Sequence, residues 1–145
     1  MRKADLHMHS RVSDGSYTIR ELAELAAKKG LDVIAVTDHD TLSHASQIPE
    51  GLPVKVIPGI EISAYDYAAD KRVHVLGYDI KDVALVEDFV HPLLEARHEN
   101  SMKQIGILEE NGYHVDLDKI HRADGKYIYK PVSYTHLRAH ETLRH

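Results

Sequence analysis

The chain has 145 residues, 43% hydrophobic and 28% charged, which is typical of one globular domain with enough apolar side chains for a core. Its 18 lysines and arginines against 23 aspartates and glutamates give a formal charge of -5, which excludes a basic footprint for duplex DNA and leaves a small charged substrate as a partner. The absence of cysteine excludes disulfides and thiolate metal sites, and without a signal peptide or an apolar run of about 20 residues we expect a cytoplasmic protein with no membrane partner.

The elements expected along the chain alternate between strands and helices, an order typical of an α/β fold. A first strand is expected over residues 3–9. A helix follows over 18–29, since Thr18 and Glu21 have the spacing of a capping box and Gly30 suits a helix end.

The run at 33–36 is short, apolar and β-branched, which predicts a strand buried on both faces of a parallel sheet. Two more strands are expected at residues 54–62 and 72–78. A long helix that Asp82 can cap is expected to end near Gly112, and Pro92 should start a helix or kink one.

Imidazoles and carboxylates stand at or near the ends of the predicted strands. They are His7, His9, Asp38, His39, Asp40, Glu61 and His74. The carboxyl ends of parallel strands form the ligand face of α/β barrels and open sheets, so these side chains can converge there. Neutral imidazoles and carboxylates suit Zn, Mn or Fe, and a carboxylate can bridge two ions. The pattern therefore predicts a multinuclear hydrolase site.

Each motif also has a structural explanation when it is taken alone. The His7-x-His9 pair can be two polar side chains on one strand face, and Asp14 can be a turn residue. The segment 37–41 can be a polar loop that caps the next helix. Glu61 can be a surface acid, and a lone strand histidine such as His74 is more often structural. The joint occurrence of all five, in this order, favours the metal site.

Residues 1–130 resemble the PHP phosphoesterases, a family named for polymerase and histidinol phosphatase. The motifs that carry the resemblance are Asp5-Leu-His7-Met-His9-Ser10, Ser13-Asp14-Gly15, Thr37-Asp38-His39-Asp40-Thr41, Gly59-Ile-Glu61-Ile-Ser63 and His74-Val-Leu-Gly-Tyr78. Within the family they are most similar to the stand-alone phosphatases that act on nucleoside 3′,5′-bisphosphates and RNA 5′ ends. Histidinol phosphatase is less similar.

The resemblance implies a distorted (β/α)7, TIM-like barrel and a cluster of two or three divalent ions, which are Mn, Zn or Fe. One ion would be held by His7, His9 and Glu61, a second by Glu61 and His74, and a third by Asp14 and His39. Glu61 would then bridge two ions. The expected chemistry is hydrolysis of a phosphate ester by metal-activated water.

Other residues receive supporting roles. Together with Glu61, Asp38 and Asp40 are the expected catalytic residues, and like Asp5 they would act by orienting ligand imidazoles. The candidate phosphate contacts, each of which can equally be a surface charge, are Lys71, Arg72, Arg97 and Lys130. The histidines outside the motifs, expected at the surface, are His44, His91, His98, His114 and His121.

The resemblance stops near the C-terminus. Related phosphatases are roughly twice as long, in the range of ordinary barrels, and supply a late His and a late Asp-x-His that are not recognisable here. Residues 1–131 are therefore expected to be the N-terminal portion of a PHP domain. Residues 132–145 are expected to be non-native, because Val132 to Thr142 matches a translated transposase sequencing adapter; a His-rich metal tail is the alternative.

Three functions remain open. The first is a phosphatase or nuclease for small phosphorylated substrates, such as nucleotides or nucleic-acid ends, with the fragment itself inactive. The second is a non-catalytic, metal-binding structural PHP module. The third is an enzyme similar to histidinol phosphatase. The complete set of upstream ligands favours the first, since a module without catalysis would be expected to lose some of them.

Overall fold

The computed structural model describes residues 1–120, 122–123 and 126–128. The sequence-based predictions for His121, for Lys130 and for the tail over 132–145 fall outside the described residues.

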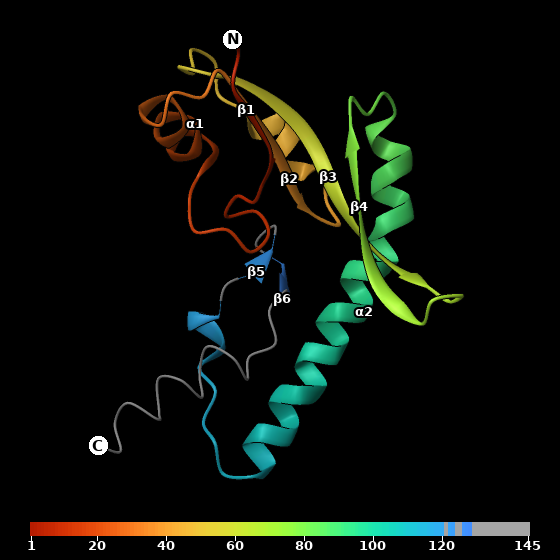
Figure 1. Cartoon of the computed structure of the whole chain (residues 1–145). Helices are drawn as coiled ribbons and strands as arrows, with labels where there is room; N and C mark the ends of the chain where they lie inside the picture. Colours follow the sequence, from red (N-terminus) through yellow and green to blue (C-terminus); the bar gives the residue numbers. More distant parts are fainter. Residues whose placement is uncertain (121, 124–125, 129–145) are drawn as a thin grey trace.

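Four strands form one mixed, curled sheet, which resembles half of a barrel (Figure 1). They are β1 (Ala4–Met8), β2 (Val33–His39), β3 (Lys55–Asp66) and β4 (Lys71–Tyr78), in the order β1-β2-β3-β4. The first three strands are mutually parallel, whereas β4 pairs antiparallel with β3. The α/β class and all four predicted strands are confirmed. The predicted alternation of strands and helices is wrong between β3 and β4, which form a hairpin.

Helix α1 (Ile19–Lys28) covers one part of the sheet (Figure 1). It begins as predicted: the Thr18 hydroxyl accepts from the Glu21 backbone N–H, and the Glu21 carboxylate accepts from the Thr18 N–H. It ends at Lys28, and Gly30 follows the C-cap Lys29 with a φ of 74°, which glycine reaches most readily. Its apolar face packs Ala23 against Ile34 of β2, and both side chains are fully buried.

Helix α2 (Val83–Glu110) runs along the other part of the molecule (Figure 1). Asp82 caps it by accepting from the Leu85 N–H at 3.0 Å, as predicted. Pro92 lies inside the helix rather than at its start, and the helix axis changes direction in its first half (Figure 1), as expected for a proline that removes a backbone hydrogen bond. Among the described residues, no helix is both long and apolar enough to cross a membrane.

Two smaller cores hold α2 in place. Val90 packs with Leu42 and with Ile60 of β3. Further along, Ile105 packs with Val115 and Ile128. Ile128 belongs to a short hairpin of β5 (Arg122–Ala123) and β6 (Tyr127–Ile128), and two 3-10 helices cover Ser43–Gln47 and Leu117–Lys119.

The alternation of side chains along β2 separates the polar residues at its end. Asp38 shares one face with Ile34, which packs against α1. His39 lies on the opposite face of the sheet. Its register partner Glu61, on the parallel neighbour β3, lies on that face as well. The sheet therefore places Glu61 and His39 on its concave side and Asp38 on the side covered by helices.

Candidate metal centre

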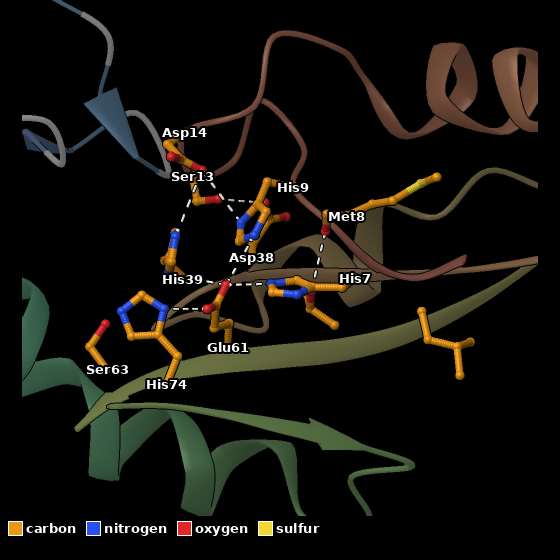
Figure 2. Close-up of polar contacts among 12 residues, drawn as sticks. His7, Met8, His9, Ser13, Asp14, Asp38, His39, Glu61, Ser63 and His74 are labelled. Atoms are coloured by element: carbon orange, nitrogen blue, oxygen red, sulfur yellow. Dashed lines mark hydrogen bonds and ion pairs between the residues drawn. The ribbon is translucent and has the colours of Figure 1, made fainter. Parts of the chain in front are cut away.

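Glu61 lies at the centre of a ring of histidines (Figure 2). Its Oε2 atom is 2.8 Å from His7 Nε2, 3.0 Å from His9 Nε2 and 3.6 Å from His39 Nδ1. Its Oε1 atom contacts His74 Nδ1. His7, His39 and His74 lie on three different strands and His9 directly follows β1, and Glu61 itself is only 3% exposed. One buried carboxylate thus gathers most of the predicted ligand residues.

The geometry of the donor atoms fits divalent ions. Among the described residues, three groups have ligand atoms that all lie within 4.8 Å of one another: His7 with His9 and Glu61; His9 with Asp14 and His39; and His39 with Glu61 and His74. Ligand bonds of about 2.0–2.2 Å to a shared ion place adjacent donors about 3–3.5 Å apart, and the imidazole nitrogens lie 2.8 to 3.6 Å from Glu61 Oε2, close to this spacing. Imidazole with carboxylate is a donor set suited to Zn, Mn or Fe.

Asp14 reaches the centre because the loop after β1 folds back on itself. The Gly15 N–H donates to the Ser10 carbonyl at 2.9 Å. A Cβ at Gly15 would lie 2.1 Å from the His9 carbonyl oxygen, so the turn requires glycine. It brings Asp14 Oδ1 to 3.4 Å from His9 Nδ1 and 3.9 Å from His39 Nε2. Asp14 is therefore a turn residue and a candidate ligand at the same time.

The protonation states also favour cation binding. Burial would raise the pKa of Glu61, but hydrogen bonds with His7 and His74 and the nearby charge of His39 lower it overall below 4.5. Burial is the main reason why the pKa of His39 lies below 6.5; His9 lowers it further, and Glu61 opposes the shift. Near neutral pH the centre therefore presents an ionised carboxylate and a neutral His39 imidazole.

Asp38 lies behind the centre rather than beside the ligand imidazoles. Its Oδ1 accepts from the Ser10 N–H at 2.7 Å and from the Ser13 hydroxyl at 2.6 Å, and its Oδ2 accepts from the Ser10 hydroxyl at 2.6 Å. Its closest imidazole contact in the described chain is His44 Nδ1, at 3.1 Å. Asp38 holds the loop that carries the ligands, because strand alternation turns it away from them.

Asp40 joins three elements next to the centre. Its Oδ1 accepts from the Ser63 N–H of β3 at 2.7 Å, and its Oδ2 lies 3.2 Å from Nη2 of Arg97 on α2. Arg97, proposed as a phosphate contact, is thus paired with a fully buried carboxylate. Asp5 accepts from the His7 backbone N–H at 3.2 Å. The other described candidates for phosphate binding, Lys71 and Arg72, are exposed on β4.

The surface placement expected for His44 is wrong, since its side chain is fully buried. The residue follows the ligand-bearing end of β2 in a short 3-10 helix. Its neighbour Leu42 is buried in the α2 core. No periodic pattern in the sequence marks this burial, which arises from packing between distant elements. Of the other histidines expected at the surface, His91 and His114 are exposed and His98 is half-buried.

Comparisons with known proteins agree with this geometry. A family model described as PHP domain matches residues 5–143. The chain is 42% identical over 119 residues to a phosphoribosyl 1,2-cyclic phosphate 1,2-diphosphodiesterase of Eggerthella lenta, covering 79% of this chain and 45% of the relative. It is 30% identical over 115 residues to a 3′,5′-nucleoside bisphosphate phosphatase of Chromobacterium violaceum, covering 77% and 40%.

A solved structure shares the fold. It is an amidohydrolase from Chromobacterium violaceum with bound sulfate and no metal, 28% identical, with a TM-score of 0.69 over 95% of this chain and 49% of that one. The chain thus spans less than half the length of the relatives described here.

Proposed function

Because the chain belongs to the PHP domain family, we propose that it forms the metal-binding face of a phosphoesterase that hydrolyses small phosphate esters with metal-activated water. In this proposal, β1 to β4 are the first strands of a distorted (β/α)7 barrel, which residues beyond the described chain would complete. Residues 1–131 would belong to the domain and residues 132–145 would not.

The observation that carries the proposal is the position of the Glu61 carboxylate. Oε2 faces His7 on β1 and His9 directly after it, and Oε1 faces His74 on β4. A carboxylate with imidazoles on both oxygens has the arrangement of a bridging ligand. We assign Glu61 as the bridge, with the remaining ligands being His7, His9, Asp14, His39 and His74.

Bound ions would lower the pKa of a water molecule and neutralise the charge that develops on the phosphate oxygens. The chain's own residues hold the geometry for this step. Glu61 keeps its negative charge at neutral pH because His7 and His74 hydrogen-bond it. Asp38 and Asp40 act on catalysis through position: Asp38 fixes the loop of Asp14, and Asp40 ties β3 to Arg97 of α2.

The substrate class follows from the relatives. The two relatives are named for a phosphoribosyl cyclic phosphate and a nucleoside bisphosphate, and both compounds carry a phosphorylated sugar. We therefore propose a small nucleotide or a nucleic-acid end as the substrate. The formal charge of -5 gives no general attraction for duplex DNA.

The test is a Glu61→Gln substitution, which keeps the side-chain shape and removes the charge. We expect Mn²⁺ affinity to fall by more than about 100-fold, because changes in outer-sphere partners already cost about 10–100-fold. Metal-dependent hydrolysis of a nucleoside 3′,5′-bisphosphate should be lost in a chain extended to the length of the relatives. Glu24→Gln, at an exposed position of α1, is the matched control. Normal metal binding and turnover in Glu61→Gln would exclude the bridging role.

A further inference from the structure

We propose that His44 is a positioning residue for the metal centre, acting through Asp38 on the loop that connects the ligands His9 and Asp14. The inference rests on the proposed function and adds a residue that lies outside the family motifs described above.

The pair is withdrawn from solvent. His44 and Asp38 are both fully buried, and His44 Nδ1 lies 3.1 Å from Asp38 Oδ2. A buried carboxylate is costly unless each oxygen has polar partners. Oδ1 has two donors, Ser10 N–H and Ser13 Oγ–H, whereas Oδ2 has one, the Ser10 hydroxyl. The His44 imidazole is therefore the second polar group beside Oδ2, at ion-pair distance and without hydrogen-bond geometry.

The carboxylate is the anchor of the ligand loop. Ser10 directly follows His9, and Ser13 directly precedes Asp14. Asp38 therefore accepts hydrogen bonds from the loop one residue away from each ligand. The Ser10 hydroxyl that donates to Asp38 also accepts from the Val12 N–H at 3.1 Å. A shift of Asp38 would thus pass to both ends of the loop.

The position of His44 is fixed by packing from the other side. The residue lies in the 3-10 helix Ser43–Gln47, two residues after Leu42. Leu42 is held in the α2 core, and its backbone N–H donates to Glu87 of α2. Thr41 also donates to Glu87, at 3.3 Å. His44 therefore links a segment fastened to α2 with the loop that follows β1.

Two substitutions separate the polar contact from simple packing. His44→Leu replaces the imidazole by an apolar side chain of similar size that has no polar nitrogen. His44→Asn places an amide nitrogen near the position of Nδ1. The matched control is His114→Asn, at an exposed position outside the site.

The first measurement is hydrogen exchange on the metal-free chain. In His44→Leu, we expect the amides of Ser10, Val12 and Gly15 to exchange at least about tenfold faster, the factor for loss of one buried polar contact. Amides of the β3–β4 ladder should be unchanged. His44→Asn should restore most of the loop protection. Equal acceleration in both segments, or none in the loop, would overturn the inference, since His44 would then be an ordinary core residue or have no effect on the loop.

The second measurement is Co²⁺ titration followed by its visible absorption. His44→Leu should bind about tenfold more weakly and with an altered spectrum, as for other residues that hold metal ligands in place. His44→Asn and His114→Asn should resemble the wild type. If the loop loosens while the wild type binds no metal, the positioning role of His44 stands and the proposed function fails. If the wild type binds and His44→Leu has unchanged affinity and spectrum, the inference fails.

Discussion

The Tyr78 hydroxyl donates a 2.6 Å hydrogen bond to the Leu6 carbonyl, although the two residues belong to opposite edge strands of the sheet, β4 and β1. A flat sheet would keep these strands three spacings of about 4.8 Å apart. The bond is possible only because the sheet curls, and it spans the concave side on which Glu61 and the histidines lie. It therefore links the shape of the sheet to the position of His7, the neighbour of Leu6.

Tyr78→Phe removes this bond and keeps the ring. We expect the free energy of unfolding to fall by about 0.5–1.5 kcal/mol, the net value of one hydrogen bond, because folding exchanges a bond from the hydroxyl to water for the bond to the Leu6 carbonyl. Denaturant unfolding measures the change. Tyr67→Phe is the control, since Tyr67 is 89% exposed. An equal effect in both variants would contradict a specific role for the Tyr78 hydroxyl.

Gly15→Ala tests the tight turn of the ligand loop. The added Cβ would lie 2.1 Å from the His9 carbonyl oxygen, so the backbone must move and Asp14 must leave its place beside His9. We expect a loss of about 1–3 kcal/mol in unfolding free energy, as for other overpacked sites, together with weaker metal binding. Gly106→Ala is the matched control: its Cβ meets nothing within 4 Å, and alanine should stabilise α2 by about 0.5–1 kcal/mol.

Local signals in the sequence were sufficient for most of the elements. The capping box of Thr18 and Glu21 marks the start of α1 because both partners lie within one helical turn. The apolar, β-branched run at 33–36 marks β2 as a buried strand, because this pattern too lies within a few consecutive residues. The β3–β4 hairpin was missed, since its turn around Asp66 and Asp70 has no Asn-Gly or Asp-Gly signal and depends on side-chain bonds such as Asp66 Oδ1 to the Ala68 N–H.

The candidate site divides in the same way. The ligand residues could be named because strand ends in parallel sheets converge, and the structure brings His7, His9 and His39 together around Glu61. The role of Asp38 could not be read from its neighbours, since adjacent residues of β2 point to opposite faces. The burial of His44 depends on α2 and the loop after β1 meeting beside the end of β2, for which no local pattern exists.

The buried His44 predicts a pH dependence of stability. Burial lowers its pKa below 6.5, against the opposing effects of Asp38, the Val36 backbone and Glu87. The unfolded chain therefore takes up a proton at a higher pH than the folded chain. Stability should be full above about pH 6.5 and fall as the pH drops from there to the folded pKa, with a slope of at most about 1.4 kcal/mol per pH unit from this group.

Unfolding of the metal-free chain between pH 5 and pH 8 measures this slope. His44→Asn removes the titrating group, so the difference between the wild type and the variant should diminish as the pH falls. His114→Asn, at an exposed histidine, should leave the profile unchanged. A wild-type profile parallel to that of His44→Asn would show that His44 takes up its proton equally in both states.

The last prediction concerns the number of ions. The three ligand groups contain nine positions but only six different residues, because His9, His39 and Glu61 each belong to two groups. A carboxylate can serve two ions, whereas a neutral imidazole has one free lone pair. If His9 joins His7 and Glu61, and His39 joins Glu61 and His74, Asp14 alone remains for a third ion. The described residues should therefore hold about two ions tightly.

We expect elemental analysis of the Mn²⁺-loaded 145-residue chain, after gel filtration, to give about two equivalents. A chain ending at Pro131 should give the same number, because we assign no ligand to residues 132–145. Phosphate release from a nucleoside 3′,5′-bisphosphate should be much slower than with the Chromobacterium violaceum relative assayed alongside, since among the described residues a third ion would have Asp14 as its only remaining ligand. A third tightly bound ion that disappears with the tail would favour a His-rich metal tail. Turnover equal to that of the relative would mean that the six residues are sufficient for catalysis.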